Sequence, residues 1–231
     1  MKWRHGIISL FTNLVAWCRQ SQIVVPADSE RRVNLGSGLQ VAKGWIHMDA
    51  SLNCFFAPFP RFFLRLVYLV SGERENMSFS TYADLLKGYR FVHHDVKFGL
   101  PFHDLALENV YSSHFLEHLS VNDGVVLLKE IHRVLQHKGR VRICVPDLEH
   151  VFRLYQEGKK EQALSYFFPP PHFGPLLQHK SMYDFELLRS HLEKAGFSTI
   201  QLCGFQKGLT PDLDTLDNRP EETLYVEAIK A

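Results

Sequence analysis

Several short apolar runs in this sequence end in residues that can contact a ligand. Gly36 and Gly38 follow the first run. Because glycine has no Cβ, such a turn lets the backbone approach a bound molecule closely. Asp49 ends the second run and Asp95 ends the third. A carboxylate at a strand end can accept hydrogen bonds from both hydroxyls of a ribose. A lone Gly-x-Gly is weak evidence, but this ordered set predicts a nucleoside-binding edge.

The fourth run leads into a second group of polar residues. It is followed directly by His114-Phe-Leu-Glu117-His118, the H-x-x-E-H pattern of one class of zinc peptidase. On a helix, the two histidines would lie one turn apart on the same face. A peptidase needs a third ligand, and no second motif clearly supplies one. With 13 histidines in the chain, a chance match to a short pattern is easily obtained. We therefore expect no metal site and interpret Glu117 and His118 as a hydrogen-bond network at the start of a helix.

Strands alternating with helices must position these residues. The pattern predicts helices over 123–135 and 181–195 and a turn at 137–139. The predicted strands are 32–35, 45–49, 90–96, 107–113, 140–147, 198–205 and 223–230. This alternation is typical of an open α/β sheet with largely parallel strands. In such a sheet, ligands bind at the carboxyl ends of the strands, where the glycines and acids stand.

Composition sets limits on the kind of protein. The chain has 231 residues, 45% of them hydrophobic, which indicates one globular domain of ordinary size. The formal net charge is +1, which argues against a protein whose main task is binding a nucleic-acid backbone. Four cysteines without regular spacing suggest neither a zinc ribbon nor a disulfide scaffold. Reduced thiols in a cytoplasmic protein are the simplest interpretation.

In their order and spacing, these segments resemble the class I S-adenosylmethionine-dependent methyltransferases. The motifs that carry the resemblance are Val33–Gly38, Gly44–Asp49, His94–Val96, Val110–His118 and Val145–Asp147. They are most similar to a bacterial branch associated with surface-polysaccharide biosynthesis. The resemblance covers roughly residues 31 to 230. It implies a Rossmann-like open twisted sheet of about seven mostly parallel strands, with an antiparallel last strand and helices on both faces.

The resemblance also implies roles for individual residues. The glycine turn would lie against the methionine part of S-adenosylmethionine, and the acid after the second strand would hold the ribose hydroxyls. The acid after the third strand would face the adenine edge, and residues after the fourth would border the methyl group. The cofactor-binding residues so implied are Gly36, Ser37, Gly38, Asp49, Asp95, Val96 and Ser112, with His114 as the catalytic candidate.

The sequence departs from the usual family pattern at the glycine turn. The common third glycine is missing, since Leu39 follows Gly38. The connection from Gly38 to Trp45 is also too short for a crossover helix, which normally needs a dozen residues or more. We expect a single turn there, and we regard Asp49 and Asp95 as the firmer contacts.

Two segments outside the sheet are amphipathic. Residues 1–22 have a basic start and apolar residues at helical spacing, which favours an amphipathic helix over the alternative of a signal peptide. Residues 1–30 would then be a helix and linker ahead of a domain at 31–231, with an insert at about 51–89. Within the insert, the two prolines and two arginines of residues 54–70 argue against a membrane span, and the stretch from Pro60 on predicts a cationic amphipathic helix. Both segments suit peripheral membrane contact, and packing on the domain is the alternative.

The predicted activity is methyl transfer to a small-molecule or glycan acceptor, with a lipid-linked glycan suiting the amphipathic segments. The sulfonium carbon is already activated, so the protein must mainly align a nucleophile and exclude water. His114 is the best-placed general base for a hydroxyl acceptor, with Asp147 and His179 behind it. Two alternatives remain open, a non-catalytic cofactor-binding domain that acts through partners and, least favoured, a zinc peptidase. The sequence determines neither the acceptor atom nor the oligomeric state.

Overall fold

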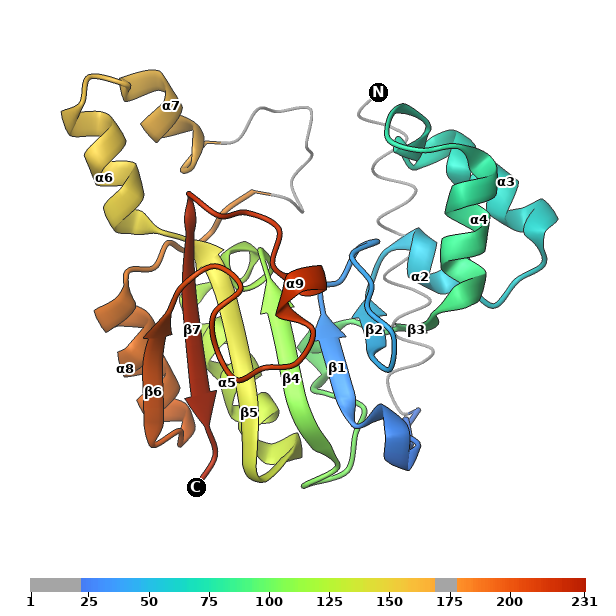
Figure 1. Cartoon of the computed structure of the whole chain (residues 1–231), viewed down its shortest axis with the longest axis horizontal. Coiled ribbons are helices and arrows are strands. Elements are labelled where there is room, and N and C mark those ends of the chain that lie inside the picture. The colour runs from blue at the N-terminus through green and yellow to red at the C-terminus, as the bar shows by residue number, and fades with distance from the viewer. Residues whose placement is uncertain (1–21, 169–177) are drawn as a thin grey trace.

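A computed structural model describes residues 22–168 and 178–231 of the chain, built on a seven-stranded sheet (Figure 1). The strand order is β3-β2-β1-β4-β5-β7-β6. β7 is antiparallel to both of its neighbours and the other pairs are parallel. The strands are β1 (Arg32–Leu35), β2 (Ile46–Asp49), β3 (Arg90–His93), β4 (Leu107–Ser113), β5 (Leu135–Pro146), β6 (Thr199–Cys203) and β7 (Thr223–Ile229). The predicted Rossmann-like sheet is confirmed.

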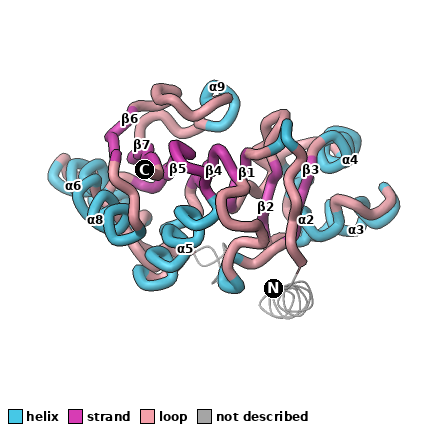
Figure 2. The backbone as a smooth tube through the Cα atoms, turned by 90° about the horizontal axis from the view of Figure 1, so that it is seen from below, coloured by secondary structure: helices cyan, strands magenta, loops and turns pink. Residues whose placement is uncertain are grey.

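Helices cover the sheet and extend beyond its carboxyl edge. They are α2 (Leu52–Phe56), α3 (Arg61–Val70), α4 (Phe79–Gly88), α5 (Val121–Val134), α6 (Leu148–Gln156), α7 (Lys160–Ser165), α8 (Phe185–Ala195) and α9 (Leu213–Leu216). Figure 2 shows α5 and α8 on one face of the sheet and α9 on the other. In Figure 1, α6–α7 and α3–α4 rise on either side of the carboxyl ends of the parallel strands. These two groups of helices therefore flank the edge where ligands are expected.

Alternating side chains give the sheet two buried faces. On one face, a large aliphatic core packs between the strands and α5 and α8, with Val33, Val110 and Ile143 fully or almost fully buried. On the other face, Tyr111 and Tyr225 pack with residues of α9. This period-two alternation requires the strands to keep their register, since a slip of one residue would exchange the two faces.

Capping residues explain where the two helices of the main face begin and end. Ser120 accepts a hydrogen bond from the Asp123 backbone N–H at the start of α5. Asp184 accepts one from Leu187 at the start of α8, and Gly196 ends that helix with a φ of +105°. The helix predicted over 181–195 is therefore shorter than expected, because Tyr183 forms an isolated bridge with Asp147.

The structure corrects the turn predicted at 137–139. β5 already begins at Leu135, and the pairing with β4 shifts register between Leu107 and Asn109. Lys138 has a φ of +65°. The predicted turn is thus an irregularity inside a long strand.

Between β2 and β3, the insert folds as α2, α3 and α4. Its own small core includes Leu64, Tyr82 and Leu86, each at most 2% exposed. None of the helices in the described ranges is long and apolar enough to cross a membrane. The helix predicted within residues 1–22 lies, except for residue 22, outside the described residues.

Candidate active site

A pocket lies where the strand order reverses, at the carboxyl ends of β1 and β4. The chain runs from β1 outward to β2 and β3, then returns to place β4 on the other side of β1. This switch point is the usual ligand position in open α/β sheets. The pocket has a volume of about 200 Å³ and is lined by Asn34, Gly36, Ser37, Gln40, Tyr111, Ser113, His114, Asn218 and Arg219.

The glycine turn after β1 adopts a backbone that suits glycine. Gly36 and Gly38 have φ values of +64° and +51°. A Cβ on Gly36 would collide with the ring of Phe115, whereas a Cβ on Gly38 would meet no atom within 4 Å. Residues 36–45 form turns without a helical segment, as the short connection predicts. Gly36 is therefore needed for close packing with Phe115, and Gly38 leaves the backbone open to a ligand.

Asp49 ties the glycine turn to the end of β2. Its Oδ2 accepts a hydrogen bond of 3.0 Å from the backbone N–H of Gly38, and its Oδ1 accepts one of 2.6 Å from Ser51. A carboxylate offers about four acceptor positions, so each oxygen keeps one for another donor.

Asp95 lies beyond the neighbouring strand. Asp49 pairs with His93 in the parallel register, so the two acids lie at the ends of adjacent strands. The carboxylate of Asp95 accepts from the Lys97 backbone N–H and lies 2.9 Å from the Lys97 ammonium group. Val96 starts the short 3-10 turn Val96–Phe98. Neither Asp95 nor Val96 lines the pocket itself.

His114 projects from the end of β4 into the pocket lining. It has a φ of +50°, a conformation that is uncommon for residues other than glycine and that is found disproportionately at functional sites. Its Nε2 lies 3.0 Å from the Thr223 hydroxyl, and its Nδ1 lies 3.3 Å from Oε1 of Glu117. The backbone N–H donates to Cys144 in β5, which holds the residue at the strand end.

The H-x-x-E-H segment is not the α-helix that a zinc peptidase motif requires. Leu116–His118 is a 3-10 turn, and His114 precedes it with a left-handed backbone. His114 and His118 therefore do not share the face of one helix. Instead, Glu117 and His118 meet His179, and one potential ligand atom from each lies within 4.8 Å of the others.

The structure brings some predicted residues together and separates others. Gly36, Ser37 and His114 line the pocket. Ser112 is 1% exposed and, by strand alternation, points to the opposite face from Tyr111 and the pocket. Gly38, in the glycine turn, and Asp49, which accepts a hydrogen bond from it, do not line the pocket.

Sequence reasoning missed the other pocket residues. Gln40 connects two parts of the chain, since its side chain donates to Thr215 and accepts from Asn218. Tyr111 donates its hydroxyl to Leu216 and Asp217, and burial raises its pKa far above the ordinary value. These residues come from the α9 region or contact it, and no local pattern predicts that this distant segment closes the pocket.

The comparisons with known proteins agree with this geometry. Residues 59–143 match the family model described as a methyltransferase domain. This stretch runs from the insert through β3, β4 and α5 into β5. The match covers 85 of the 231 residues of the chain. It supports the methyl-transfer activity and the S-adenosylmethionine cofactor that the resemblance implies.

Solved structures show the same fold at low sequence identity. A S-adenosylmethionine-dependent methyltransferase from Archaeoglobus fulgidus aligns with a TM-score of 0.52 and 16% identity, covering 95% of this chain and 94% of that chain. The apo form of the S-adenosylmethionine-dependent methyltransferase SibL aligns with a TM-score of 0.50 and 16% identity, covering 98% of this chain and 56% of that one. No curated protein matches the sequence.

The residues at this edge fit S-adenosylmethionine in two respects. The backbone at Gly38 is open to close approach, and Asp49 keeps acceptor positions that two ribose hydroxyls can use. The ring of Phe115 fills the space beside Gly36, so this protein uses the first glycine of the turn at least in part for packing.

Proposed function

We propose that this protein is an S-adenosylmethionine-dependent methyltransferase that transfers a methyl group to a hydroxyl of a small-molecule or glycan acceptor bound at the carboxyl ends of β1 and β4. The observation that carries the proposal is His114, a strained histidine that lines the pocket and has Glu117 behind it. The cofactor supplies an activated methyl group, so the chain's own residues need to orient the acceptor and remove its proton.

His114 is the proposed general base. If its Nδ1–H is directed at the Glu117 carboxylate, Nε2 carries the lone pair and faces the Thr223 hydroxyl. An acceptor hydroxyl that displaces Thr223 from Nε2 could then give up its proton to His114. The buried carboxylate of Glu117, with Oε1 3.3 Å from Nδ1, would favour that tautomer through its charge.

For the cofactor, we propose that Asp49 binds the ribose hydroxyls and that Asp95 and Val96 border the adenine. The glycine turn from Gly36 to Gly38 would hold the methionine part. Support comes from the adjacent strand ends that carry the two acids and from the acceptor positions left on Asp49.

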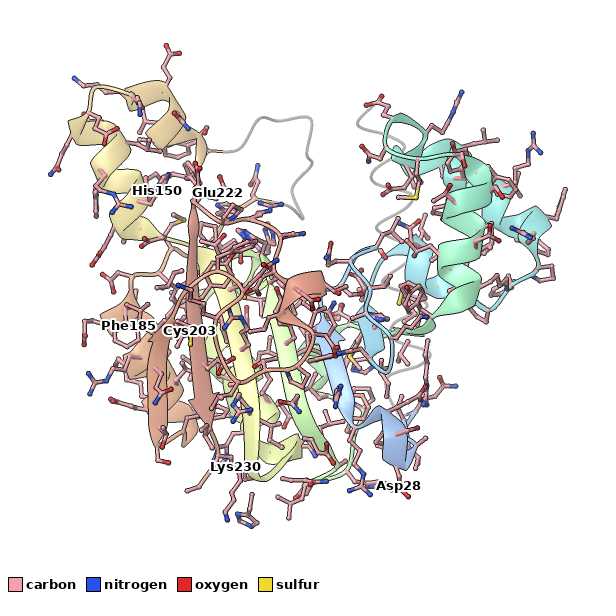
Figure 3. All side chains as sticks on the ribbon, in the orientation of Figure 1. Asp28, His150, Phe185, Cys203, Glu222 and Lys230 are labelled. Carbon is pink, nitrogen blue, oxygen red and sulfur yellow. The ribbon has the colours of Figure 1, made fainter. Side chains whose placement is uncertain are left out.

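Calorimetric titration with S-adenosylmethionine tests the cofactor assignment. Asp49→Ala should abolish measurable binding, and Asp49→Asn, which keeps the size of the side chain, should weaken it severely. Asp28→Ala is the matched control, because Asp28 lies at the opposite end of the sheet (Figure 3). Thermal unfolding would show whether each variant is folded. Unchanged affinity in a folded Asp49→Ala would overturn the ribose assignment.

A turnover assay tests the chemistry separately. Release of S-adenosylhomocysteine would be measured with free sugars, soluble glycans and lipid-linked glycans as acceptors. His114→Asn keeps a residue that tolerates a positive φ, and it should lower kcat by about 100-fold or more at unchanged cofactor affinity. Cofactor binding without turnover on any acceptor would favour a non-catalytic domain that acts through partners.

We also propose that α3 contacts a membrane surface, which would bring the enzyme to a lipid-linked glycan of the surface-polysaccharide type. Leu64 and Val67 pack α3 onto the insert, while Phe62 and Leu66 remain 71% and 52% exposed. Leu69 and other apolar residues extend this exposed face. Arginines on the same helix would add attraction to anionic headgroups. Residues 1–21, the other segment proposed for this contact, lie outside the described part of the chain.

Vesicle sedimentation tests the membrane proposal. The wild type should bind vesicles that contain phosphatidylglycerol more strongly than neutral vesicles. Replacing Phe62 and Leu66 by serine should reduce that binding, whereas Leu202→Ser, at an equally exposed leucine on β6, should not. Equal binding by all three proteins would remove α3 from the proposal, without affecting the assignments in the pocket.

A further inference from the structure

We propose that Glu117, His118 and His179 form a binding site for one divalent transition-metal ion, of which Zn²⁺ is the best match, beside the acceptor pocket. The three residues come from two segments that are 61 residues apart in the chain. The site is separate from the cofactor-binding residues, and it goes beyond the methyl-transfer function proposed above.

The first observation is the burial of Glu117. Its side chain is 0% exposed, and neither carboxylate oxygen accepts a hydrogen bond from any residue in the described ranges. Nδ1 of His114 lies 3.3 Å from Oε1 of Glu117, without hydrogen-bond geometry. A buried carboxyl group without partners is costly, so native proteins almost always pair it with a donor or a cation.

The second observation is the orientation of the two histidines. Nδ1 of His179 lies 2.6 Å from the carbonyl oxygen of Tyr166, and Nδ1 of His118 lies 3.3 Å from that of Gln178. A carbonyl oxygen only accepts, so each Nδ1 must carry the proton. In the neutral ring, Nε2 then holds the lone pair that a metal requires. Histidine ligands in metal sites usually donate their other N–H to a backbone carbonyl or a carboxylate in this way.

The backbone holds the two segments side by side. The backbone N–H groups of Lys180 and Ser181 both donate to the carbonyl oxygen of Glu117, at 2.7 and 3.2 Å. The rings of His118 and His179 have their centroids 5.2 Å apart. This pairing, and not a sequence motif, supplies the ligand that the H-x-x-E-H pattern lacks.

The distances are close to those of an assembled site. The three potential ligand atoms lie within 4.8 Å of one another. Around a tetrahedral Zn²⁺ with bonds of about 2.0–2.1 Å, ligand atoms stand roughly 3.4 Å apart. Small side-chain rotations would therefore close the site. Two imidazole nitrogens and one carboxylate suit Zn²⁺, Fe²⁺, Mn²⁺ or Co²⁺ better than Mg²⁺ or Ca²⁺.

Such a site would differ from that of a zinc peptidase. His114 would not be a ligand, since it lies in the pocket lining with Thr223 at its Nε2. Three protein ligands leave one position open, as in catalytic zinc sites. Because Glu117 would contact both the metal and His114, occupancy of the metal site should alter the histidine that we propose as the base.

Metal binding to the full chain tests the inference directly. The protein would be freed of metal with a chelator, dialysed, and titrated with Zn²⁺ by calorimetry. Co²⁺ would be used in parallel, because its visible d–d absorption reports coordination by protein nitrogen. We expect one equivalent per chain. His118→Ala and His179→Ala should each weaken Zn²⁺ binding at least tenfold and abolish the Co²⁺ bands.

Two further variants complete the metal-binding test, one at a proposed ligand and one as a control. Glu117→Gln preserves the shape of the side chain and should also lose the Co²⁺ spectrum. His103→Ala removes an exposed histidine between β3 and β4 and should change nothing. Absence of stoichiometric binding, or binding that persists in both His118→Ala and His179→Ala, would overturn the inference. Titration with S-adenosylmethionine on the same metal-free protein reports the proposed methyl-transfer function independently, so each idea can fail alone.

Discussion

Two clusters of buried polar groups lie on this sheet, and they are satisfied to very different degrees. In the first, the fully buried guanidinium of Arg142 donates to both oxygens of Asp217 and to the carbonyl oxygens of Gly204 and Lys207. It also donates to Glu227 at 3.3 Å. Each of these partners belongs to the same chain, so the protein itself neutralises this charge.

In the second cluster, around Glu117, the described part of the protein provides far fewer hydrogen-bond partners. Glu117 is as deeply buried as Arg142, yet its carboxyl oxygens accept no hydrogen bond within the described part of the chain. Two of its neighbours, His118 and His179, direct their Nδ1 protons to backbone carbonyls. A complete network stabilises the fold, whereas an incomplete one at a pocket indicates a group that arrives from outside. The incomplete cluster at Glu117 is therefore the candidate for a functional role.

The largest expected effect comes from breaking the complete network. Asp217→Asn would leave the buried guanidinium of Arg142 without its main counter-charge. We expect the free energy of unfolding to fall by about 3–5 kcal/mol, as when one partner of a buried ion pair is removed. Urea denaturation measures this change. Glu193→Gln, which removes an exposed ion pair with Arg189, should cost less than about 1 kcal/mol. A similar small cost for Asp217→Asn would contradict the comparison.

A smaller effect should appear in how the free energy of unfolding depends on acid pH, through Glu227. Burial alone would raise the pKa of Glu227, but hydrogen bonds from the backbone of Leu209 and Thr210 and the charge of Arg142 hold it below the ordinary value of 4.5. The carboxyl group of Glu227 therefore binds a proton less readily in the folded state than in the unfolded state. The stabilisation that ionised Glu227 contributes to the fold is present above about pH 4.5 and is lost as the pH falls through the folded-state pKa of this group. Glu227→Gln should therefore flatten the decline of unfolding free energy with acid, and an unchanged slope would contradict this.

The smallest effect on stability is expected in the incomplete cluster. Glu117→Gln removes no hydrogen bond accepted by that side chain, so the unfolding free energy of the metal-free protein should change by less than about 1 kcal/mol. Turnover should nevertheless decrease strongly, because His114 loses its carboxylate neighbour. A loss of stability as large as that of Asp217→Asn would show that Glu117 is a structural residue.

The sequence predicts some features of this site correctly and others only in part. Asp49 and Asp95 were predicted at strand ends, and the structure ends β2 at Asp49 and β3 at His93, because a strand and the residues that follow it are local features. The pairing of β2 with β3 is a tertiary feature that was not predicted. The hydrogen-bond network expected at Glu117 was only partly right. The backbone carbonyl of Glu117 is bonded, whereas its carboxyl group accepts no hydrogen bond from the described residues. Such a distinction depends on burial, which spacing does not report.

Long-range pairing explains what was missed. His179 approaches Glu117 because residues 180–183 run beside the end of β5, with Tyr183 bridged to Asp147. Asn218 and Arg219 reach the pocket from the loop after α9. The role of Gly36 was predicted from ligand contact alone, but packing against Phe115 also requires it. These contacts arise from tertiary structure, and no local propensity encodes them.

The position of β7 has a consequence for how the chain reaches its native state. It is the last strand in the sequence, yet it lies between β5 and β6. During synthesis, β6 cannot join the sheet until residues 223–229 have emerged, and Arg142 in β5 waits for Asp217 and Glu227 over the same interval. Pairing across such sequence separations slows folding. We expect closure of this C-terminal hairpin to limit the folding rate, with β5 offering an unpaired edge to other chains until then.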